Sequence, residues 1–477
     1  MDTKRYINLA AGPVLFALCC LLLPQGLFES FASRAAIGTV AWMAYWWVTA
    51  PVDYAVTAFL PIALNAIFQM TDQSQVIANY ASEIILLLLG ASIITVSWEE
   101  TGLDKRIAAR FLGLVGSSFR GQLLFWFILS TVLSSILPNA VVCATISPIA
   151  LSMLKFVGEG DISKSRIGAK LLLYIAYGAG LGGLATPLGG AMNLVVVDYI
   201  QQVTGEEFMY VDWIVRFAPI MAALFIICIV FMLRDVKKDE TLGGSKEYFQ
   251  QEYGKLPKMS REEAICLALF VIATVLAFTR QLYANLLPGL KPAYVFITAG
   301  LLTFIFSKRG EKGLQPERLM LWKSVEGKIT WELIYIYAGG LAIGTLINNT
   351  GAASAIGNAV SSAGMSGGLL FIFVIVVFTL LMSDFTSNTA TASIAMPIVI
   401  SIVSGMGENP IPYIYIATIG VNLSFMLPTS IRAIPVGYGL SPKYMLKEGW
   451  KISVVIIILM SLMGYALMTW WPAFSVA

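Results

Sequence analysis

Long apolar blocks, almost free of charge, are the feature that most limits how this chain can fold. A hydrocarbon core of about 30 Å needs about 20 such residues for each helical crossing. The blocks recur along the whole sequence, at residues 7–23, 35–50, 84–96, 213–233, 264–279, 294–306, 369–382 and 452–471. Only 12% of the 477 residues are charged, whereas soluble domains carry roughly twice that fraction. The sequence therefore predicts an all-α polytopic membrane protein.

The composition also argues against several classes of function. The chain has no histidine, so an imidazole base or a histidine-bound metal is excluded. Its five cysteines lie in apolar stretches without a CxxC pair, which favours core packing over a redox or metal site. We predict no cofactor, no resident metal and no nucleic-acid partner. An intramembrane enzyme is the rival from another class, but the sequence offers no paired catalytic aspartates and no Ser–Lys dyad in a shared site.

The basic residues predict the topology. Most of the 31 lysines and arginines fall in alternate connecting segments, as the positive-inside rule requires; the exceptions are Arg34, Arg216, Arg280, Lys291 and Arg432. This pattern predicts a multi-pass protein of the cell (inner) membrane with a cytoplasmic N-terminus, an outside C-terminus and about 11 crossings. Residues 121–156 and 367–404 must then each enter and leave on one side. Each has a polar interruption near its middle, which predicts two re-entrant hairpins.

The two halves of the chain correspond at one constant offset. Four landmarks match, namely Glu83 and Gly90 with Glu332 and Gly339, Thr101-Gly102 with Thr350-Gly351, Pro138-Asn139-Ala140 with Ser387-Asn388-Thr389, and Pro148 with Pro397. A further pair of Gly-, Pro- or Ser-containing breaks lies at 179–190 and 421–432. Inverted repeats that each hold a hairpin and a broken helix are typical of secondary transporters. A channel is less favoured, because the polar residues cluster at the breaks instead of forming a continuous stripe.

These features predict five segments along the chain. They are N-terminal scaffold helices at 1–82, a first transport repeat at 83–212, scaffold helices at 213–331, a second transport repeat at 332–449, and a C-terminal helix at 450–477. The first repeat would contain the hairpin 121–156 and a broken helix at 166–203. The second would contain the hairpin 367–404 and a broken helix at 411–440. Residues 234–262 are predicted to form a cytoplasmic loop between the repeats.

The second hairpin tip has the chemistry of an anion site. Ser387, Asn388 and Thr389 precede a helix-forming segment at 390–400. Such residues place hydroxyl and amide groups beside free backbone N–H donors, at the positive end of a helix dipole, which suits a carboxylate. The alternative is that the tip only caps its own helix. Asn139 holds the same place in the first tip, with fewer side-chain oxygens around it.

Arg432 is the one basic residue that this topology places inside a crossing. A fixed charge at that depth is expensive and is usually functional, although the side chain could instead snorkel to the inner surface. Asp384 could pair with Arg432 or orient the second tip. We expect Arg432 to contact an anionic substrate.

With these motifs the sequence resembles the divalent anion:sodium symporter family, also called the dicarboxylate/sulfate carriers (DASS). The resemblance covers nearly the whole chain and rests on Ser387-Asn388-Thr389 followed by Ala390-Thr391-Ala392, on Asn139, and on the Thr186-Pro187 and Leu427-Pro428 breaks. It implies a homodimer with scaffold and transport domains, elevator-type alternating access and di- or tricarboxylate substrates. Many members couple to sodium, with a cation beside each tip, and others are exchangers.

The resemblance also implies site residues. Substrate would be bound by Asn139, Ser387, Asn388 and Thr389, with Pro138, Ala140, Gly189, Thr429, Ser430 and Arg432 around them. Sodium, if used, would bind at Ser134, Pro138, Asn139 and Gly189, and at Ser383, Thr386, Asn388 and Ser430.

Two departures from the sodium-coupled pattern decide the predicted function. The first tip has Pro138 and Ala140 in place of a full Ser-Asn-Thr, and the second break has Ile431-Arg432 where sodium-coupled members resemble Thr-Pro. Arg432 could supply permanently the positive charge that sodium brings. Moving this charge across the membrane without a bound anion would be energetically unfavourable. We therefore predict sodium-independent exchange of dicarboxylates such as succinate, malate or 2-oxoglutarate. The alternative is a sodium-coupled di- or tricarboxylate symporter.

Overall fold

The computed structural model describes every residue except 1–2, 113–115, 246, 249–250, 252–256, 309–316, 363–366 and 477. Apart from two isolated bridges, Ser118–Thr241 and Ser307–Arg318, the regular structure of the described residues is helical. Seven helical stretches among them are long and apolar enough to cross a membrane, and shorter apolar helices accompany them. The predicted all-α, multi-helix membrane architecture is therefore confirmed.

The first half of the chain forms the following helices: α1 (Thr3–Leu22), α2 (Phe31–Thr49), α3 (Tyr54–Thr57), α4 (Leu60–Phe68), α5 (Gln73–Ala78), α6 (Glu83–Thr101), α7 (Leu103–Leu112), α8 (Phe119–Ser134), α9 (Asn139–Phe156), α10 (Arg166–Leu184), α11 (Ala191–Thr204) and α12 (Tyr210–Leu233). The short 3-10 helices η1 (Asn79–Ala81) and η2 (Pro187–Gly189) lie before α6 and between α10 and α11.

The second half forms α14 (Arg261–Phe278), α15 (Arg280–Tyr283), α16 (Pro292–Ile305), α17 (Trp322–Val325), α18 (Trp331–Asn349), α19 (Ala352–Ser362), α20 (Leu369–Phe385), α21 (Asn388–Gly405), α22 (Pro410–Asn422), α23 (Ala433–Gly437) and α24 (Pro442–Trp470). The 3-10 helix η3 (Ser430–Arg432) precedes α23, and η4 (Pro472–Ser475) follows α24.

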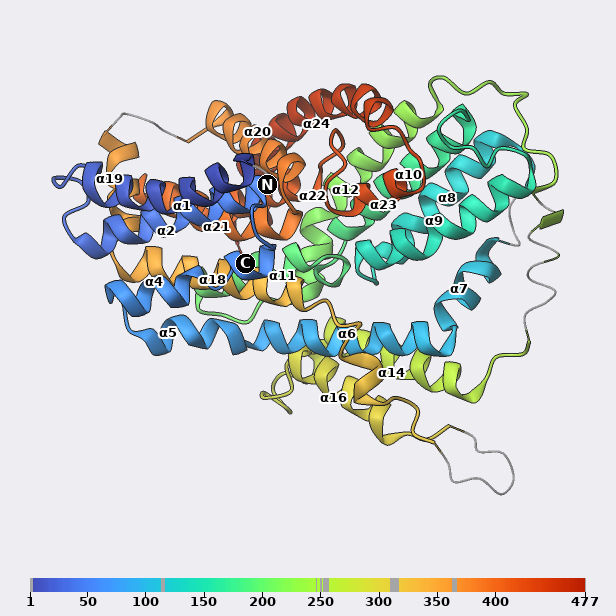
Figure 1. Cartoon of the computed structure of the whole chain (residues 1–477), viewed down its shortest axis with the longest axis horizontal. Helices are drawn as coiled ribbons and strands as arrows, with labels where there is room; N and C mark the ends of the chain where they lie inside the picture. Colours follow the sequence, from blue (N-terminus) through green and yellow to red (C-terminus); the bar gives the residue numbers. More distant parts are fainter. Residues whose placement is uncertain are drawn as a thin grey trace.

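The chain contains two helical hairpins and two broken helices. The helices α8 and α9 form the first hairpin, and α20 and α21 form the second. The hairpins extend toward the middle of the molecule from opposite ends (Figure 1). The first broken helix is α10–η2–α11, and the second is α22 followed by η3 and α23. The tips and the breaks therefore meet near the centre of the fold.

Local sequence signals explain where these helices begin. Ser118, Ser165 and Ser387 each cap a helix, because each hydroxyl accepts a hydrogen bond from the backbone N–H three residues later. Ser260 and Glu263 form a reciprocal capping box at the start of α14. Such short-range signals lie within a few residues of one another, so the sequence predicts them well.

The helices that open the two repeats pack against helices predicted as scaffold. α6 lies along α16 and α14, and Gly90 permits this close approach, since a Cβ there would lie 2.5 Å from the backbone nitrogen of Ile297. α18 packs on α2, α3, α4 and α5 as well as on α21. The predicted boundaries at residues 83 and 332 therefore do not separate the repeats from the scaffold in space. The helices that begin at these residues pack against scaffold helices, because helix packing depends on the shapes of the contacting surfaces.

The C-terminal helix also begins earlier than expected. The predicted boundary was residue 450, but α24 starts at Pro442 and includes Lys443, Lys447 and Lys451. Proline is well suited to the first turn of a helix, and the charged residues simply extend the helix beyond its apolar block. Near the other end, Arg216 of α12 donates hydrogen bonds to the carbonyl oxygens of Ala473 and Val476.

The amphipathic helix α7 contacts the N-terminal end of α14. Arg106 Nε lies 2.7 Å from Glu263 Oε1, and Arg106 Nη1 donates to the carbonyl oxygen of Pro257. The loop predicted at 234–262 is described only in part. Its first section packs on the first hairpin, where Ser245 accepts a hydrogen bond from Gln122.

Candidate functional site

The first tip connects the end of α8 to the start of α9 and packs against the first break. Ser134 is fully buried, and its hydroxyl donates to the carbonyl oxygen of Ala179 at 2.6 Å. Asn139 is also buried, at the first position of α9. Thr186 Oγ1 donates to the carbonyl oxygen of Ser135, which holds the break against the tip.

Backbone oxygens crowd around Gly189 in this first cluster. A Cβ at Gly189 would lie 2.6 Å from the carbonyl oxygen of Ser134 and 2.7 Å from that of Gly183. A Cβ at Gly183 would lie 3.2 Å from Asn139 Nδ2. The structure therefore brings Ser134, Asn139 and Gly189 together. Carbonyl oxygens of unwound helices are the groups with which transporters bind sodium.

The second tip places its polar side chains at the start of α21. Ser387 is half-buried and caps the N–H of Ala390 at 3.1 Å, so part of its function is to cap its own helix. Asn388 and Thr389 are buried. The single hydroxyl hydrogen of Ser383 is shared between two acceptors, Asn388 Oδ1 at 2.9 Å and the carbonyl oxygen of Val421 at 2.6 Å. Among the described residues, Asn388 Nδ2 has no hydrogen-bond partner. It is a buried donor that an anion could satisfy.

The remaining predicted residues lie in different surroundings. Thr386 Oγ1 and Thr391 Oγ1 are 2.7 Å apart and share a hydrogen bond. Pro138 is half-buried, whereas Ala140 is exposed and contributes no polar side-chain atom. Ser430 is exposed and has φ +51, a left-handed conformation that is uncommon for a non-glycine residue. Thr429 is half-buried and faces Asp384 and Arg432.

Arg432 is buried and braces the second break. Its Nε donates to the carbonyl oxygen of Leu427 at 3.0 Å, Nη1 to that of Ser424 at 2.7 Å, and Nη2 to Thr429 Oγ1 at 2.8 Å. The side chain is only 2% exposed, so it does not snorkel to a surface. A guanidinium carries five N–H donors, and these contacts leave N–H groups that can still meet an anion.

Asp384 binds the backbone of the same break. Its Oδ1 accepts hydrogen bonds from the backbone N–H groups of Met426 and Leu427, at 3.0 and 3.3 Å. Asp384 therefore binds the amides of the break while Arg432 binds its carbonyl oxygens. Asp384 is fully buried, and its Oδ2 has no partner among the described residues. The two opposite charges hold the unwound segment between them.

Sequence reasoning missed two asparagines that join the clusters. Asn422 Nδ2 donates to Asn193 Oδ1 at 2.9 Å, across the two broken helices. Asn193 Nδ2 in turn donates to the carbonyl oxygens of Gly183 and Thr186. Both side chains are buried. The available signal was a polar amide within each apolar broken helix, since such residues in membrane segments are commonly functional.

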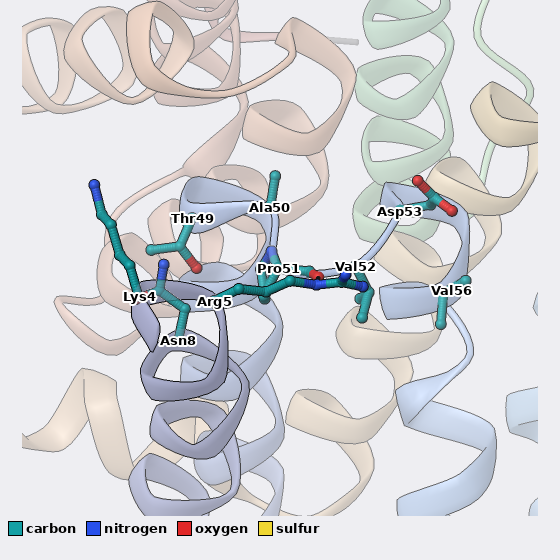
Figure 2. A pocket seen from close by; sticks show the side chains of 9 residues that line it. All are labelled: Lys4, Arg5, Asn8, Thr49, Ala50, Pro51, Val52, Asp53 and Val56. Atoms are coloured by element: carbon teal, nitrogen blue, oxygen red, sulfur yellow. Dashed lines mark hydrogen bonds between the residues drawn. The ribbon is translucent and has the colours of Figure 1, made fainter. Parts of the chain in front are cut away.

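The cavity in Figure 2 lies elsewhere. It has a volume of about 620 Å³ and is lined by residues of α1, the end of α2, the turn after it and α3, namely Lys4, Arg5, Asn8, Thr49, Ala50, Pro51, Val52, Asp53 and Val56. Arg5 lies beside Pro51 and donates to its carbonyl oxygen, while Lys4 points away (Figure 2). No hairpin or break residue lines it, so the buried polar clusters at the tips are the candidate site.

The chain is similar to known transporters. A family model described as a citrate transporter (CitMHS) matches residues 44–420. The sodium-dependent dicarboxylate transporter SdcS of Staphylococcus saprophyticus is 29% identical, over 98% of this chain and 92% of its own length. SdcS of Staphylococcus aureus strain MRSA252 is 28% identical, over 98% of this chain and 92% of its length.

A solved structure supports the fold. The YdaH transporter of Alcanivorax borkumensis superposes with a TM-score of 0.54, over 84% of this chain and 88% of that one, at 10% sequence identity. At that identity the likeness concerns the fold alone. Together with the apolar helices, it identifies a polytopic α-helical membrane protein.

Proposed function

Because the chain belongs to the citrate transporter family, we propose that it is a secondary transporter that carries a four- or five-carbon dicarboxylate across the cell membrane together with sodium. The observation that carries the proposal is the near full-length similarity to two sodium-dependent dicarboxylate transporters. The sequence by itself favoured sodium-independent exchange. The similarity favours the sodium-coupled alternative, so exchange becomes the second candidate.

The substrate carboxylates bind at the second tip. Three groups there offer positive charge or donors: the N-terminal end of α21, the unpartnered Nδ2 of Asn388, and the N–H groups of Arg432 that the break does not use. A helix N-terminus favours negative charge. Ser387 and Thr389 belong to the same turn, and Asn139 supplies an amide from the first tip.

The sodium ion binds at the first tip. The carbonyl oxygens of Ser134 and Gly183 crowd around Gly189, and Asn139 is adjacent. The Gly183 carbonyl oxygen accepts a hydrogen bond from the neutral amide of Asn193, whereas at the second break the carbonyl oxygens of Ser424 and Leu427 accept hydrogen bonds from the charged Arg432. A cation would have to compete there with a fixed guanidinium. The first cluster therefore supplies the more favourable oxygen ligands.

The proposed movement follows the hairpins. The two hairpins and the two broken helices form the transport unit, and α1–α6 with α14 and α16 form the scaffold. The unit moves as an elevator between the two sides, within a homodimer, with the N-terminus cytoplasmic and the C-terminus outside. The pseudo-symmetric breaks support alternating access, and the dimer rests on the family resemblance.

Obligatory exchange is the second candidate, and Arg432 is the observation that favours it. A buried guanidinium would have to cross with no anion beside it in an empty carrier, which is unfavourable. With a dicarboxylate bound, the charge is compensated. Such a carrier would need internal substrate and would be indifferent to sodium.

Uptake of labelled succinate into proteoliposomes tests the proposal. We expect uptake into empty vesicles in sodium buffer, and little uptake when choline replaces sodium. Asn388→Ala should raise the half-saturating succinate concentration, whereas Asn65→Ala should leave it unchanged, because Asn65 bonds only within the α4–α5 region of the scaffold. Uptake that requires internal dicarboxylate and is the same in choline would contradict symport and establish exchange.

A further inference from the structure

We propose that Asn193 and Asn422 couple the two hairpin tips, so that a cation at the first tip raises the affinity of the second tip for dicarboxylate. Both are positioning residues in this proposal, because they act through the groups they hold. The inference rests on the proposed sodium-coupled function and adds to it the route by which one ligand affects the other.

Asn193 holds the backbone of the first break. It lies in the first turn of α11, and its Nδ2 donates to the carbonyl oxygen of Gly183 at 2.5 Å and to that of Thr186 at 2.8 Å. Gly183 is adjacent to Gly189 and Asn139, where the carbonyl oxygens converge. Any ligand that draws these oxygens together therefore also moves the partner atoms of Asn193.

These two hydrogen bonds also fix which way the Asn193 amide points. Its NH₂ group must face the two carbonyl oxygens, so its Oδ1 faces away from them. Asn422 Nδ2 donates to that oxygen at 2.9 Å. If the amide of Asn422 were flipped, two oxygens would face each other. The network therefore determines the orientation of both side chains.

The chain of contacts continues from Asn422 to the second tip. Asn422 is the last residue of α22, and the neighbouring Val421 and Ser424 both touch the cluster around Asn388. Ser383 Oγ lies within hydrogen-bond distance of the carbonyl oxygen of Val421 and of Asn388 Oδ1 and shares its one hydrogen between them. Ser424 Oγ donates to the same Oδ1 at 3.3 Å. A shift of the end of α22 would thus reorient the unpartnered Nδ2 of Asn388.

A purely structural function explains this pair less well. Asn422 Oδ1 is buried and has no hydrogen-bond partner in the described part of the chain. A buried acceptor without a partner costs about 1–3 kcal/mol, and apolar side chains of similar size would avoid that cost. A pair that transmits a ligand-dependent movement accounts for keeping two amides in an apolar contact between α11 and α22.

The coupling must act in both directions. If sodium at the first tip raises succinate affinity, succinate must raise sodium affinity by the same factor. One neutral hydrogen bond between the two breaks can transmit about a three- to tenfold change in affinity. Loss of either asparagine should remove that factor while both ligands still bind.

A double-mutant cycle tests the proposal. The half-saturating succinate concentration is measured in proteoliposomes at low and at saturating sodium for the parent, Asn193→Ala, Asn422→Ala and the double variant. In the parent, saturating sodium should lower this concentration by about three- to tenfold. In each single variant the ratio should fall close to one, and the double variant should show no further loss. Asn65→Ala, another buried asparagine that bonds to backbone, should keep the parental ratio.

The outcomes separate this inference from the function on which it rests. If the parent shows no sodium effect at all, the sodium-coupled function is wrong. If the parent shows the effect and Asn422→Ala retains it in full, the coupling route is wrong and the function stands. If the alanine variants do not fold, Asn193→Ser and Asn422→Ser replace them. A serine hydroxyl is too short to make both contacts, so the ratio of the half-saturating succinate concentrations at low and saturating sodium should again fall. A parental ratio in these variants would overturn the proposal.

Discussion

Replacing Arg432 with alanine should weaken both the fold and dicarboxylate binding. The change removes three hydrogen bonds from a charged donor and leaves the carbonyl oxygen of Ser424 unpaired, whereas that of Leu427 keeps its hydrogen bond from the backbone N–H of Thr429. It also removes a buried positive charge that interacts with the buried carboxylate of Asp384. A buried acceptor that loses its hydrogen bond costs about 1–3 kcal/mol. We expect a loss of stability of that order.

The substrate effect adds to the stability effect. If the N–H groups of Arg432 that the break does not use meet a carboxylate, Arg432→Ala should raise the half-saturating succinate concentration at least about tenfold. Thermal unfolding of the purified protein and succinate uptake in proteoliposomes measure the two effects separately. A double variant, Asp384→Asn with Arg432→Met, removes both charges and should recover part of the lost stability without recovering the affinity.

A matched control exists outside the proposed site. Arg280 is also buried, at 3% exposure, and binds Glu207 and the carbonyl oxygens of Leu287 and Pro288. Arg280→Ala should therefore reduce stability but leave the succinate half-saturation unchanged. If Arg432→Ala transports succinate with the parental half-saturation, the guanidinium does not contact substrate. If the double variant is no more stable than the single one, the two charges do not act as a unit.

Two further predictions concern the first tip and the contact between α7 and α14. Gly189→Ala should abolish sodium-dependent succinate uptake, because the added Cβ would lie 2.6 Å from the carbonyl oxygen of Ser134. Gly26→Ala is the control, because a Cβ at Gly26 meets open space. Equal uptake by the two variants would refute the argument that the first tip has no room for a Cβ at Gly189. Glu263→Gln should lower the thermal unfolding midpoint by an amount that corresponds to about 1 kcal/mol, since it weakens the charge-assisted bond to Arg106 but keeps the helix cap. An equal loss in an Arg106→Ala background would show that the two residues act independently.

Much of the fold could be predicted because its signals are local. The hairpin tips are short polar interruptions in apolar blocks, and each is recognised from a few consecutive residues such as Ser387, Asn388 and Thr389. The breaks at Thr186-Pro187 and Leu427-Pro428 are equally local, since proline and glycine act on the backbone at their own positions. The constant offset between Asn139 and Asn388 then relates the two halves without any knowledge of packing.

The partners of the buried polar groups could not be predicted in the same way. Arg432 was expected to contact substrate or to snorkel, but two of its three hydrogen bonds go to the carbonyl oxygens of the second break. The helices α6 and α18 begin the sequence repeats, yet they pack with the scaffold helices. Side-chain reach and helix shape decide such contacts, and neither leaves a pattern along the chain.

The sequence by itself determined that this protein lies in a membrane, that it consists of two related halves, and where the polar tips occur. These properties follow from hydrophobicity and from local backbone preferences, which act over a few residues. The tertiary structure alone decided that Asn193 meets Asn422 and that Asp384 and Arg432 enclose one break. Those residues are far apart in the chain, and a hydrogen bond or a charge interaction acts only over a few ångströms, so folding must bring them together before their chemistry exists.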